Sequence, residues 1–168
     1  MKMERCRPIQ NNWMSKLQEG SKQEIYAIGG PCTARDLADH DPSFVGYCGP
    51  KMETLRWIRS LFATDYYVIS LTLDVVGLEC AVALKNGYAL GTALAIGMAE
   101  KAGNDGINHN NSEAALFQES VKEMLDLLRI VGGGVDNIMY AAGDLNVTVA
   151  AGRSRTVGLL LGKGLSIG

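Results

Sequence analysis

An apolar stretch at residues 78–99 sets the main limit on how this chain can fold. It is long enough to cross a membrane, but Glu79, Lys85 and Asn86 lie inside it. Charged groups at that depth of a bilayer cost free energy. We therefore interpret the stretch as part of a buried helix that runs from Val75 to Ala102, and we expect no membrane segment.

The periodicity of the sequence changes near Asp74. Before this residue, three short runs rich in β-branched and aromatic residues alternate with two segments of helical spacing, an order typical of an α/β layer. The predicted strands are Glu24–Gly30, Phe44–Cys48 and Tyr66–Leu71, with helices at Thr33–Ala38 and Met52–Phe62. After it, only helices are predicted, at Val75–Ala102, Ser112–Val131, Asp136–Ala142 and Ser154–Leu161. We predict an α/β part at 1–73 and a helical domain at 74–168, with the first helix the longest.

Residue types typical of helix ends divide the helical half further. The candidate N-caps are Ser112 and Asp136, and the candidate left-handed C-terminal residues are Gly132, Gly143 and Gly162. A helix that ends at Gly143 would leave the polar residues that follow between two helices.

Charge and cysteine content argue against several classes of function. A formal net charge of −2 with mixed signs offers no basic surface to a phosphate backbone, so we expect no nucleic-acid partner. The four cysteines, Cys6, Cys32, Cys48 and Cys80, form no Cys-x-x-Cys pair and have no histidine nearby. Neither a metal site nor a disulfide scaffold is therefore expected. Residues 1–10 do not read as a secretory signal, so we expect a cytoplasmic protein.

Lys85 is the first candidate for chemistry, because the residues one helical turn away from it are small or apolar. Burying an ammonium is costly unless it is paired, and desolvation lowers the pKa of a lysine toward neutrality. Lys85 is therefore a candidate general acid/base, with Asn86 beside it as a weaker candidate. The alternative is a lysine that reaches the surface or forms a structural pair with Glu79 or an aspartate.

A second candidate group combines a carboxylate, a hydroxyl and a guanidinium at 143–148 and 152–155. Arginine can hold a phosphate through two hydrogen bonds, amides at a helix start add donors, and an aspartate can accept from a carbinol hydroxyl. This set suits a small phosphorylated polyol. The alternative is that Asp144 caps a helix and that Arg153 is solvated.

A third candidate is the turn at 29–34, which follows a predicted strand and opens a predicted helix. Its small residues would allow a ligand to approach the backbone closely. The alternative is an ordinary strand-to-helix turn with proline at the first helical position.

Taken in order, the three features resemble the motif series of NAD(P)-dependent glycerol-3-phosphate dehydrogenases. Gly30-Pro-Cys-Thr-Ala34 resembles the Gly-Pro-Ser/Thr-Phe-Ala turn of that family. Residues 77–86 are similar to its Gly-Val-Glu-Leu-Gly-Gly-Ala-Leu-Lys-Asn helix. Gly143-Asp-Leu-x-x-Thr148 then follows, and Gly152-Arg-Ser-Arg155 resembles the Ser/Gly-Arg-Asn-Arg turn. The resemblance covers residue 24 to the end of the sequence.

The resemblance implies a partial Rossmann-type layer of about three strands, followed by a helical domain like that of 6-phosphogluconate dehydrogenase and incomplete at its C-terminus. It implies reversible reduction of dihydroxyacetone phosphate to glycerol 3-phosphate with NADH or NADPH, in a homodimer. Lys85 would be the catalytic acid/base. The implied substrate-binding residues are Gly30, Cys32, Asn86, Asp144, Thr148, Gly152, Arg153 and Ser154, and the implied cofactor-binding residues are Ala34 and Arg153.

The sequence also departs from the family pattern. Cys32 replaces a hydroxyl residue, Ser154 replaces an asparagine, and Val82 replaces a glycine, which adds volume that could displace the lysine. No Gly-x-Gly-x-x-Gly follows an early strand, so we expect the isolated chain to bind substrate weakly and to turn over negligibly. Two alternatives stay open: a non-catalytic remnant or assembly module of the family, and a related dehydrogenase with another substrate.

Overall fold

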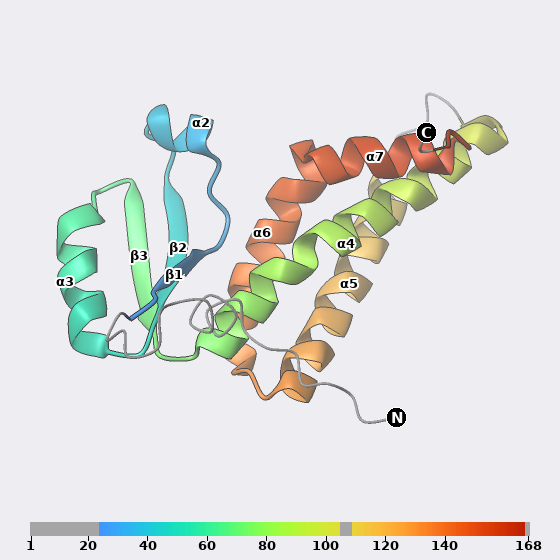
Figure 1. The fold of residues 1–168 in the computed structure, drawn as a ribbon. Helices are drawn as coiled ribbons and strands as arrows, with labels where there is room; N and C mark the ends of the chain where they lie inside the picture. Colours follow the sequence, from blue (N-terminus) through green and yellow to red (C-terminus); the bar gives the residue numbers. More distant parts are fainter. Residues whose placement is uncertain (1–23, 105–108, 167–168) are drawn as a thin grey trace.

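The computed structural model describes residues 24–104 and 109–166, which form a small sheet with two helices and a separate helical part (Figure 1). The elements are, in order, β1 (Ala27–Gly29), α2 (Ala34–Ala38), β2 (Ser43–Cys48), α3 (Met52–Phe62), β3 (Tyr67–Thr72), α4 (Val75–Ala99), a π-helical turn η1 (Glu100–Asn104), α5 (Asn110–Val131), a 3-10 turn η2 (Val135–Asn137), α6 (Ile138–Ala151) and α7 (Arg153–Gly162). The predicted fold class is confirmed, and α4 is the longest helix described. The predictions for Cys6 and for residues 1–10 lie outside the described residues.

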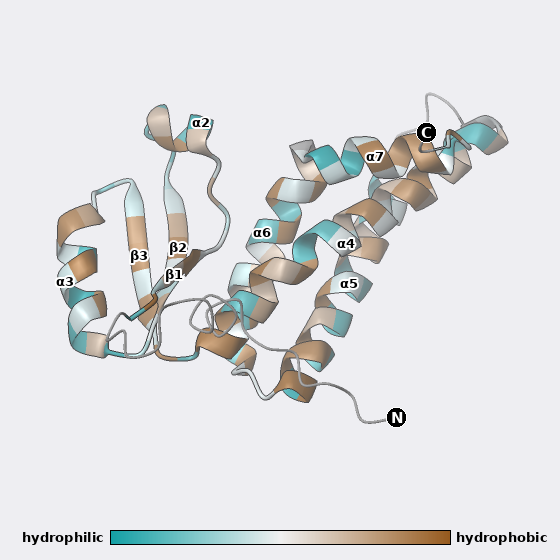
Figure 2. Ribbon diagram, in the orientation of Figure 1, coloured by the Kyte–Doolittle hydropathy of each residue, from teal (hydrophilic) through white to brown (hydrophobic). Residues whose placement is uncertain are grey.

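The sheet has the strand order β1-β2-β3. Strand β2 runs parallel to β3, with Ser43 opposite Tyr67, whereas the short β1 runs antiparallel to β2, with Ala27 opposite Cys48. One face is covered by α3, whose Leu55 packs into a buried cluster with β2 and β3 residues. Figure 2 shows the apolar residues along β2 and β3 that form this layer.

The other face of the sheet packs against the helical part. Leu78 of α4 and Tyr140 of α6 form a buried cluster with Cys48 at the end of β2. A Cβ on Gly46 would lie 3.0 Å from Leu78 Cδ1 and 3.1 Å from Tyr140 Cζ, so glycine there lets both side chains reach the sheet. Cys48 is fully buried in this cluster and is therefore a packing residue, and burial raises the pKa of its thiol to about 11.

The helical part has its core where α4, α5 and α6 meet, around Ala81, Met124, Leu128 and Leu145. Helix α7 lies directly against α4, because glycines on both helices remove side chains from the contact. A Cβ on Gly158 would lie 2.8 Å from the Cβ of Ala93. Within the described ranges, no helix is both long and apolar enough to cross a bilayer.

The predicted end of a helix at Gly143 is wrong. Helix α6 continues through Gly143 to Ala151, so Asp144 and Thr148 lie inside a helix and not between two helices. A Cβ on Gly143 would lie 2.9 Å from Pro31 Cγ, so the glycine is needed for close approach of the β1–α2 turn.

Other predicted helix ends are corrected in part. Gly132 is left-handed at φ 79° and ends α5 as predicted, but α5 starts at Asn110 with His109 as its N-cap, so Ser112 is inside the helix. Asp136 lies in η2, and Asn137 is the N-cap of α6. Beyond α7 the left-handed residue is Gly164 and not Gly162.

The start of α4 is fixed by Asp74, a cap that the sequence analysis did not identify. Its Oδ1 accepts a hydrogen bond from the backbone N–H of Gly77 at 2.9 Å. Its Oδ2 accepts from Gly134 N at 2.6 Å and from Asn137 Nδ2 at 2.7 Å. One carboxylate therefore ties the start of α4 to the connection between α5 and α6.

Candidate functional site

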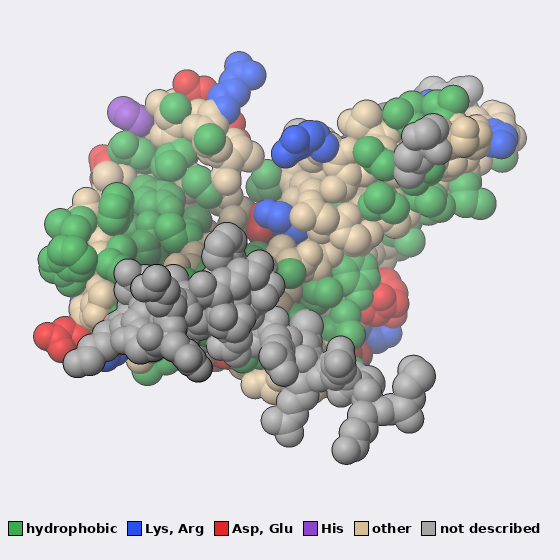
Figure 3. Space-filling view, in the orientation of Figure 1, with side chains coloured by type: hydrophobic (Ala, Val, Ile, Leu, Met, Phe, Trp, Pro, Cys, Tyr) green, Lys and Arg blue, Asp and Glu red, His purple; other side chains and the backbone are tan. Residues whose placement is uncertain are grey.

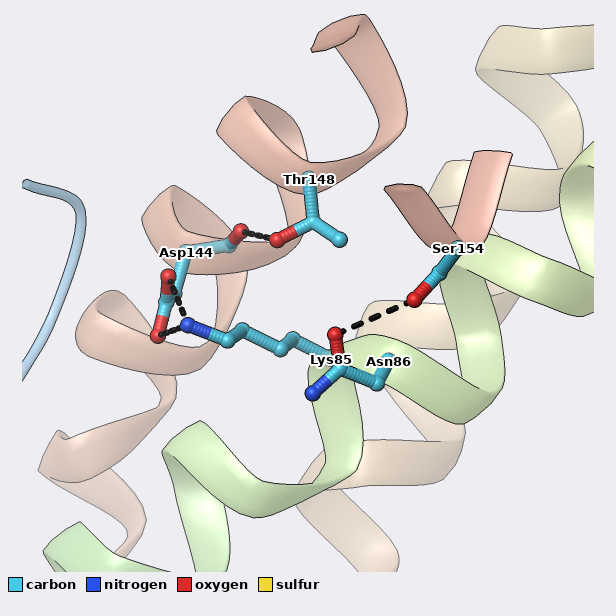
Figure 4. A network of polar contacts seen from close by, with 5 residues as sticks. All are labelled: Lys85, Asn86, Asp144, Thr148 and Ser154. Atoms are coloured by element: carbon cyan, nitrogen blue, oxygen red, sulfur yellow. Dashed lines mark hydrogen bonds and ion pairs between the residues drawn. The ribbon is translucent and has the colours of Figure 1, made fainter. Parts of the chain in front are cut away.

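Two of the predicted site residues, Lys85 and Asp144, form an ion pair between α4 and α6 (Figure 4). Lys85 Nζ donates to both carboxylate oxygens of Asp144, at 2.7 and 2.8 Å. The Asp144 side chain is only 6% exposed and that of Lys85 is 30% exposed. The carboxylate is therefore deep in the helical part, while the lysine can be reached from outside.

The electrostatics of this pair are dominated by burial. Burial raises the pKa of Asp144 above its ordinary value, although the hydrogen bond and the charge of Lys85 act to lower it. The Asp144 carboxylate orients the ammonium and holds it in place. An ammonium held in this way and still accessible can donate a proton to a substrate oxygen.

The turn after β1 lies next to Asp144. Gly30 has φ 128°, a left-handed conformation that favours glycine, and Pro31 lies against Gly143, the residue before Asp144. Cys32 packs instead against the cluster beneath α3, so its sulfur is used in packing of the sheet. Ala34 is exposed at the start of the short α2.

The second predicted motif begins α7. Gly152 is the N-cap of this helix, and its N–H donates to Thr148 O at 2.8 Å. Arg153 is exposed, with no hydrogen bond or ion pair to any residue of the described ranges. Arg155, by contrast, contacts Glu113 Oε1 at 2.6 Å and the Val149 carbonyl at 2.9 Å. Of these two arginines, Arg153 is the one available to an anion.

The remaining predicted polar residues have partners within the protein. Ser154 Oγ donates to Asn86 Oδ1 at 3.2 Å, which joins the start of α7 to α4 beside Lys85 (Figure 4). Thr148 Oγ1 donates to the Asp144 carbonyl at 2.7 Å, one turn back in its own helix. The structure thus brings Asn86 and Ser154 together, but it engages the Thr148 hydroxyl in a local helical bond.

The added volume of Val82 lies against the sheet. Its side chain packs in the cluster with Leu78 and Tyr140, over β1. A Cβ on Gly29 would lie 2.7 Å from Val82 Cγ1, so the glycine in β1 leaves the space that the valine fills.

Tyr140, a residue that was not among the predicted site residues, lies one helical turn before Asp144 and is 7% exposed. Its hydroxyl is hydrogen-bonded to that of Ser70 on β3, and its ring stacks on Phe44 of β2 with centroids 6.5 Å apart. A large aromatic residue among the small residues of 141–143 was the only signal in the sequence.

The surface around the site carries both charge signs. Figure 3 shows basic and acidic atoms together in the hollow between the sheet and the helical part, on a face that is otherwise largely apolar or uncharged. Across the described residues, no group of three His, Cys, Asp or Glu side chains could hold a metal ion.

Comparison with known proteins gives consistent results. The family model described as the NAD-dependent glycerol-3-phosphate dehydrogenase C-terminus matches residues 74–168. The chain is 30% identical over 154 residues to NADP(+)-dependent glycerol-3-phosphate dehydrogenase of Archaeoglobus fulgidus, covering 90% of this chain and 45% of that protein. It is 33% identical over 150 residues to glycerol-3-phosphate dehydrogenase (NAD(P)+) of Geobacter metallireducens, covering 83% and 41%.

A solved structure of glycerol-3-phosphate dehydrogenase from Coxiella burnetii is similar in fold. Its TM-score is 0.73 at 25% sequence identity, over 84% of this chain and 42% of that one. The chain thus spans less than half the length of the curated relatives reported above.

Proposed function

Since the chain belongs to the NAD-dependent glycerol-3-phosphate dehydrogenase family, we propose that it forms the substrate-binding part of an enzyme that interconverts dihydroxyacetone phosphate and glycerol 3-phosphate. The ion pair of Lys85 with Asp144 is the observation that carries this proposal. It places an accessible ammonium on a buried carboxylate, where a carbonyl oxygen of the substrate could approach.

Lys85 is the general acid/base of the proposed reaction. When dihydroxyacetone phosphate is reduced, the Lys85 ammonium donates a proton to the carbonyl oxygen as it becomes a hydroxyl, and the reverse reaction returns the proton to the amine. Asp144 orients the ammonium from its buried position. Asn86, the next residue of α4, is hydrogen-bonded to Ser154 and is a further proposed donor for the substrate.

Arg153 is the proposed phosphate ligand. It is unpaired within the described ranges and stands at the start of α7, where backbone amides of residues 153 and 154 can also donate to an anion. Gly30, Cys32, Thr148 and Gly152 stay predictions as substrate residues. The packing of Cys32 and the internal bond of Thr148 argue for indirect contributions from these two side chains.

NAD or NADP is the proposed cofactor, and it would supply the hydride. The described residues supply only part of a site for such a molecule, because Ala34 and Arg153 are exposed while no glycine-rich loop of the Rossmann type follows a described strand. We therefore assign no step of the reaction to a bound dinucleotide.

We also propose a domain boundary at 73/74, a homodimer and a cytoplasmic location. The boundary is supported by the start of the family match at residue 74 and by the change from sheet to helices at α4. The homodimer is supported by the family resemblance alone, and the cytoplasmic location stays an expectation from the sequence.

Calorimetric titration of dihydroxyacetone phosphate into the whole chain tests the proposal. Wild type should bind measurably, Arg153→Ala should bind at least about tenfold more weakly because it loses a charge-assisted bidentate contact, and Arg155→Lys should bind like wild type. Equal binding by Arg153→Ala would remove this arginine from the site. Tighter binding of 6-phosphogluconate than of dihydroxyacetone phosphate would favour a related dehydrogenase, and no binding of either would favour a non-catalytic module.

A further inference from the structure

We propose that Tyr140 is a positioning residue that sets the distance between the two halves of the substrate site, and this inference rests on the function proposed above. One half is the turn at Gly30 and Pro31, which is carried by the sheet. The other half is the Lys85–Asp144 pair, which is carried by α4 and α6. Tyr140 belongs to α6 but makes its polar contact with the sheet.

The environment of the Tyr140 ring is built from the sheet. Its hydroxyl bonds to Ser70 on β3, and its ring stacks on Phe44 of β2 at an interplanar angle of 15°. Two glycines make room for the ring, since a Cβ on Gly46 would lie 3.1 Å from Tyr140 Cζ and one on Gly30 would lie 3.6 Å from Cδ1. The ring is therefore located by three different segments of the α/β part.

Because Tyr140 is part of α6, its contacts with the sheet also fix the position of Asp144 in the same helix. Residues four apart lie on the same side of a helix, so Asp144 follows Tyr140 on the side that faces the turn. Pro31 of the turn lies against Gly143, the residue before Asp144. A rotation or shift of α6 on the sheet would move Asp144, and with it the Lys85 ammonium, relative to Gly30.

This spacing matters for the proposed reaction because a substrate that contacts both halves needs them at a fixed separation. Inorganic phosphate would contact only the start of α7, so its binding does not depend on the separation of the two halves. The two ligands therefore separate the positioning role of Tyr140 from a general effect on folding.

The test uses the whole chain and variants that remove one hydroxyl each. Tyr140→Phe and Ser70→Ala both break the hydrogen bond while leaving the ring in place, and Ser70→Thr keeps a hydroxyl at position 70. Tyr47→Phe is the matched control, because it removes a tyrosine hydroxyl that lies 3.4 Å from the Tyr67 hydroxyl within the same sheet. Residual dipolar couplings report the orientation of the sheet relative to α6, and calorimetry reports the binding of dihydroxyacetone phosphate and of inorganic phosphate.

We expect Tyr140→Phe and Ser70→Ala to give the same change in couplings and about fivefold weaker binding of dihydroxyacetone phosphate, the effect of one ordinary hydrogen bond. Phosphate binding should stay unchanged, and Ser70→Thr and Tyr47→Phe should behave like wild type. Wild-type couplings and binding in Tyr140→Phe would overturn the inference. If wild type binds neither ligand, the proposed function fails, and the couplings alone then decide whether Tyr140 positions α6.

Discussion

Replacement of Lys85 with methionine is the sharpest test of the ion pair. Methionine keeps an unbranched apolar stem of four heavy atoms but removes the ammonium. Asp144, whose side chain is 6% exposed, would lose the two hydrogen bonds of 2.7 and 2.8 Å that it accepts from Nζ. A buried carboxylate would then have no cationic partner.

The expected cost at pH 7 is about 1 to 3 kcal/mol in the free energy of unfolding, the range for leaving a buried polar group without its partner. It should fall below the cost for a fully buried pair, because Lys85 is 30% exposed and water can replace part of its contribution. In a domain of this size, a loss of 1 kcal/mol lowers Tm by roughly 2 to 4 °C.

The effect should depend on pH in a defined direction. Burial already raises the pKa of Asp144, and the two influences that lower it both come from Lys85. In Lys85→Met the pKa of Asp144 should therefore rise further. A carboxyl with a raised folded-state pKa contributes most stability when it is protonated, and this contribution is lost as the pH rises through that pKa. The deficit of Lys85→Met should thus be largest at pH 7 and shrink on acidification.

Urea unfolding at pH 7 and at mildly acidic pH, together with carbon NMR titration of the Asp144 carboxyl, measures both effects. Lys85→Met/Asp144→Asn should recover most of the loss at pH 7, since no buried carboxylate remains. Lys122→Met is the control, because Lys122 pairs with Glu119 at an exposed position and its loss should not be measurable. A deficit that is the same at every pH, or an unchanged Asp144 pKa, would refute the reasoning.

Three further predictions concern packing, capping and turnover. Gly158→Ala should destabilise the chain by about 1 to 3 kcal/mol in urea unfolding, because its Cβ would meet the backbone of α4, whereas the open site at Gly91 should accept alanine without loss. Asp74→Ala should cost about 1 to 2 kcal/mol at neutral pH as the cap of α4 is lost, and hydrogen exchange should show faster opening at Gly77 and Gly134. The isolated chain should show negligible oxidation of NADH or NADPH with dihydroxyacetone phosphate in an absorbance assay, and robust turnover would contradict this.

Local sequence patterns predicted the bounds of the helices and strands whose formation depends on neighbouring residues in the chain. Helix α3 spans Met52–Phe62 as predicted, because Pro50 precedes it and its apolar residues recur at helical spacing. Strands β2 and β3 lie within one residue of their predicted bounds. Strand β1 is shorter than predicted and antiparallel to β2, since its pairing depends on a partner strand that a local pattern does not specify.

The arrangement of the candidate site was predictable only in part. The apolar surroundings of Lys85 and the family resemblance predicted a lysine whose amine is directed toward Asp144 or Arg153, and the structure places it on Asp144. Which of the two it meets depends on where α6 crosses α4. Gly143 was predicted to end a helix, but glycine is needed there because Pro31 packs against it. Pro31 lies more than a hundred residues earlier in the chain, so a local pattern does not show this contact. The bond between Ser70 and Tyr140 is hidden from local patterns for the same reason.

The contact of Val82 with Gly29 limits how this protein can be redesigned. The two positions share one volume, so a change at either is acceptable only with a compensating change at the other. Restoring a glycine at 82 on its own would open a void over β1, and adding a side chain at 29 on its own would force the strand away from α4. A chimaera that joins the helical half of this chain to the sheet of a relative should therefore exchange both residues together.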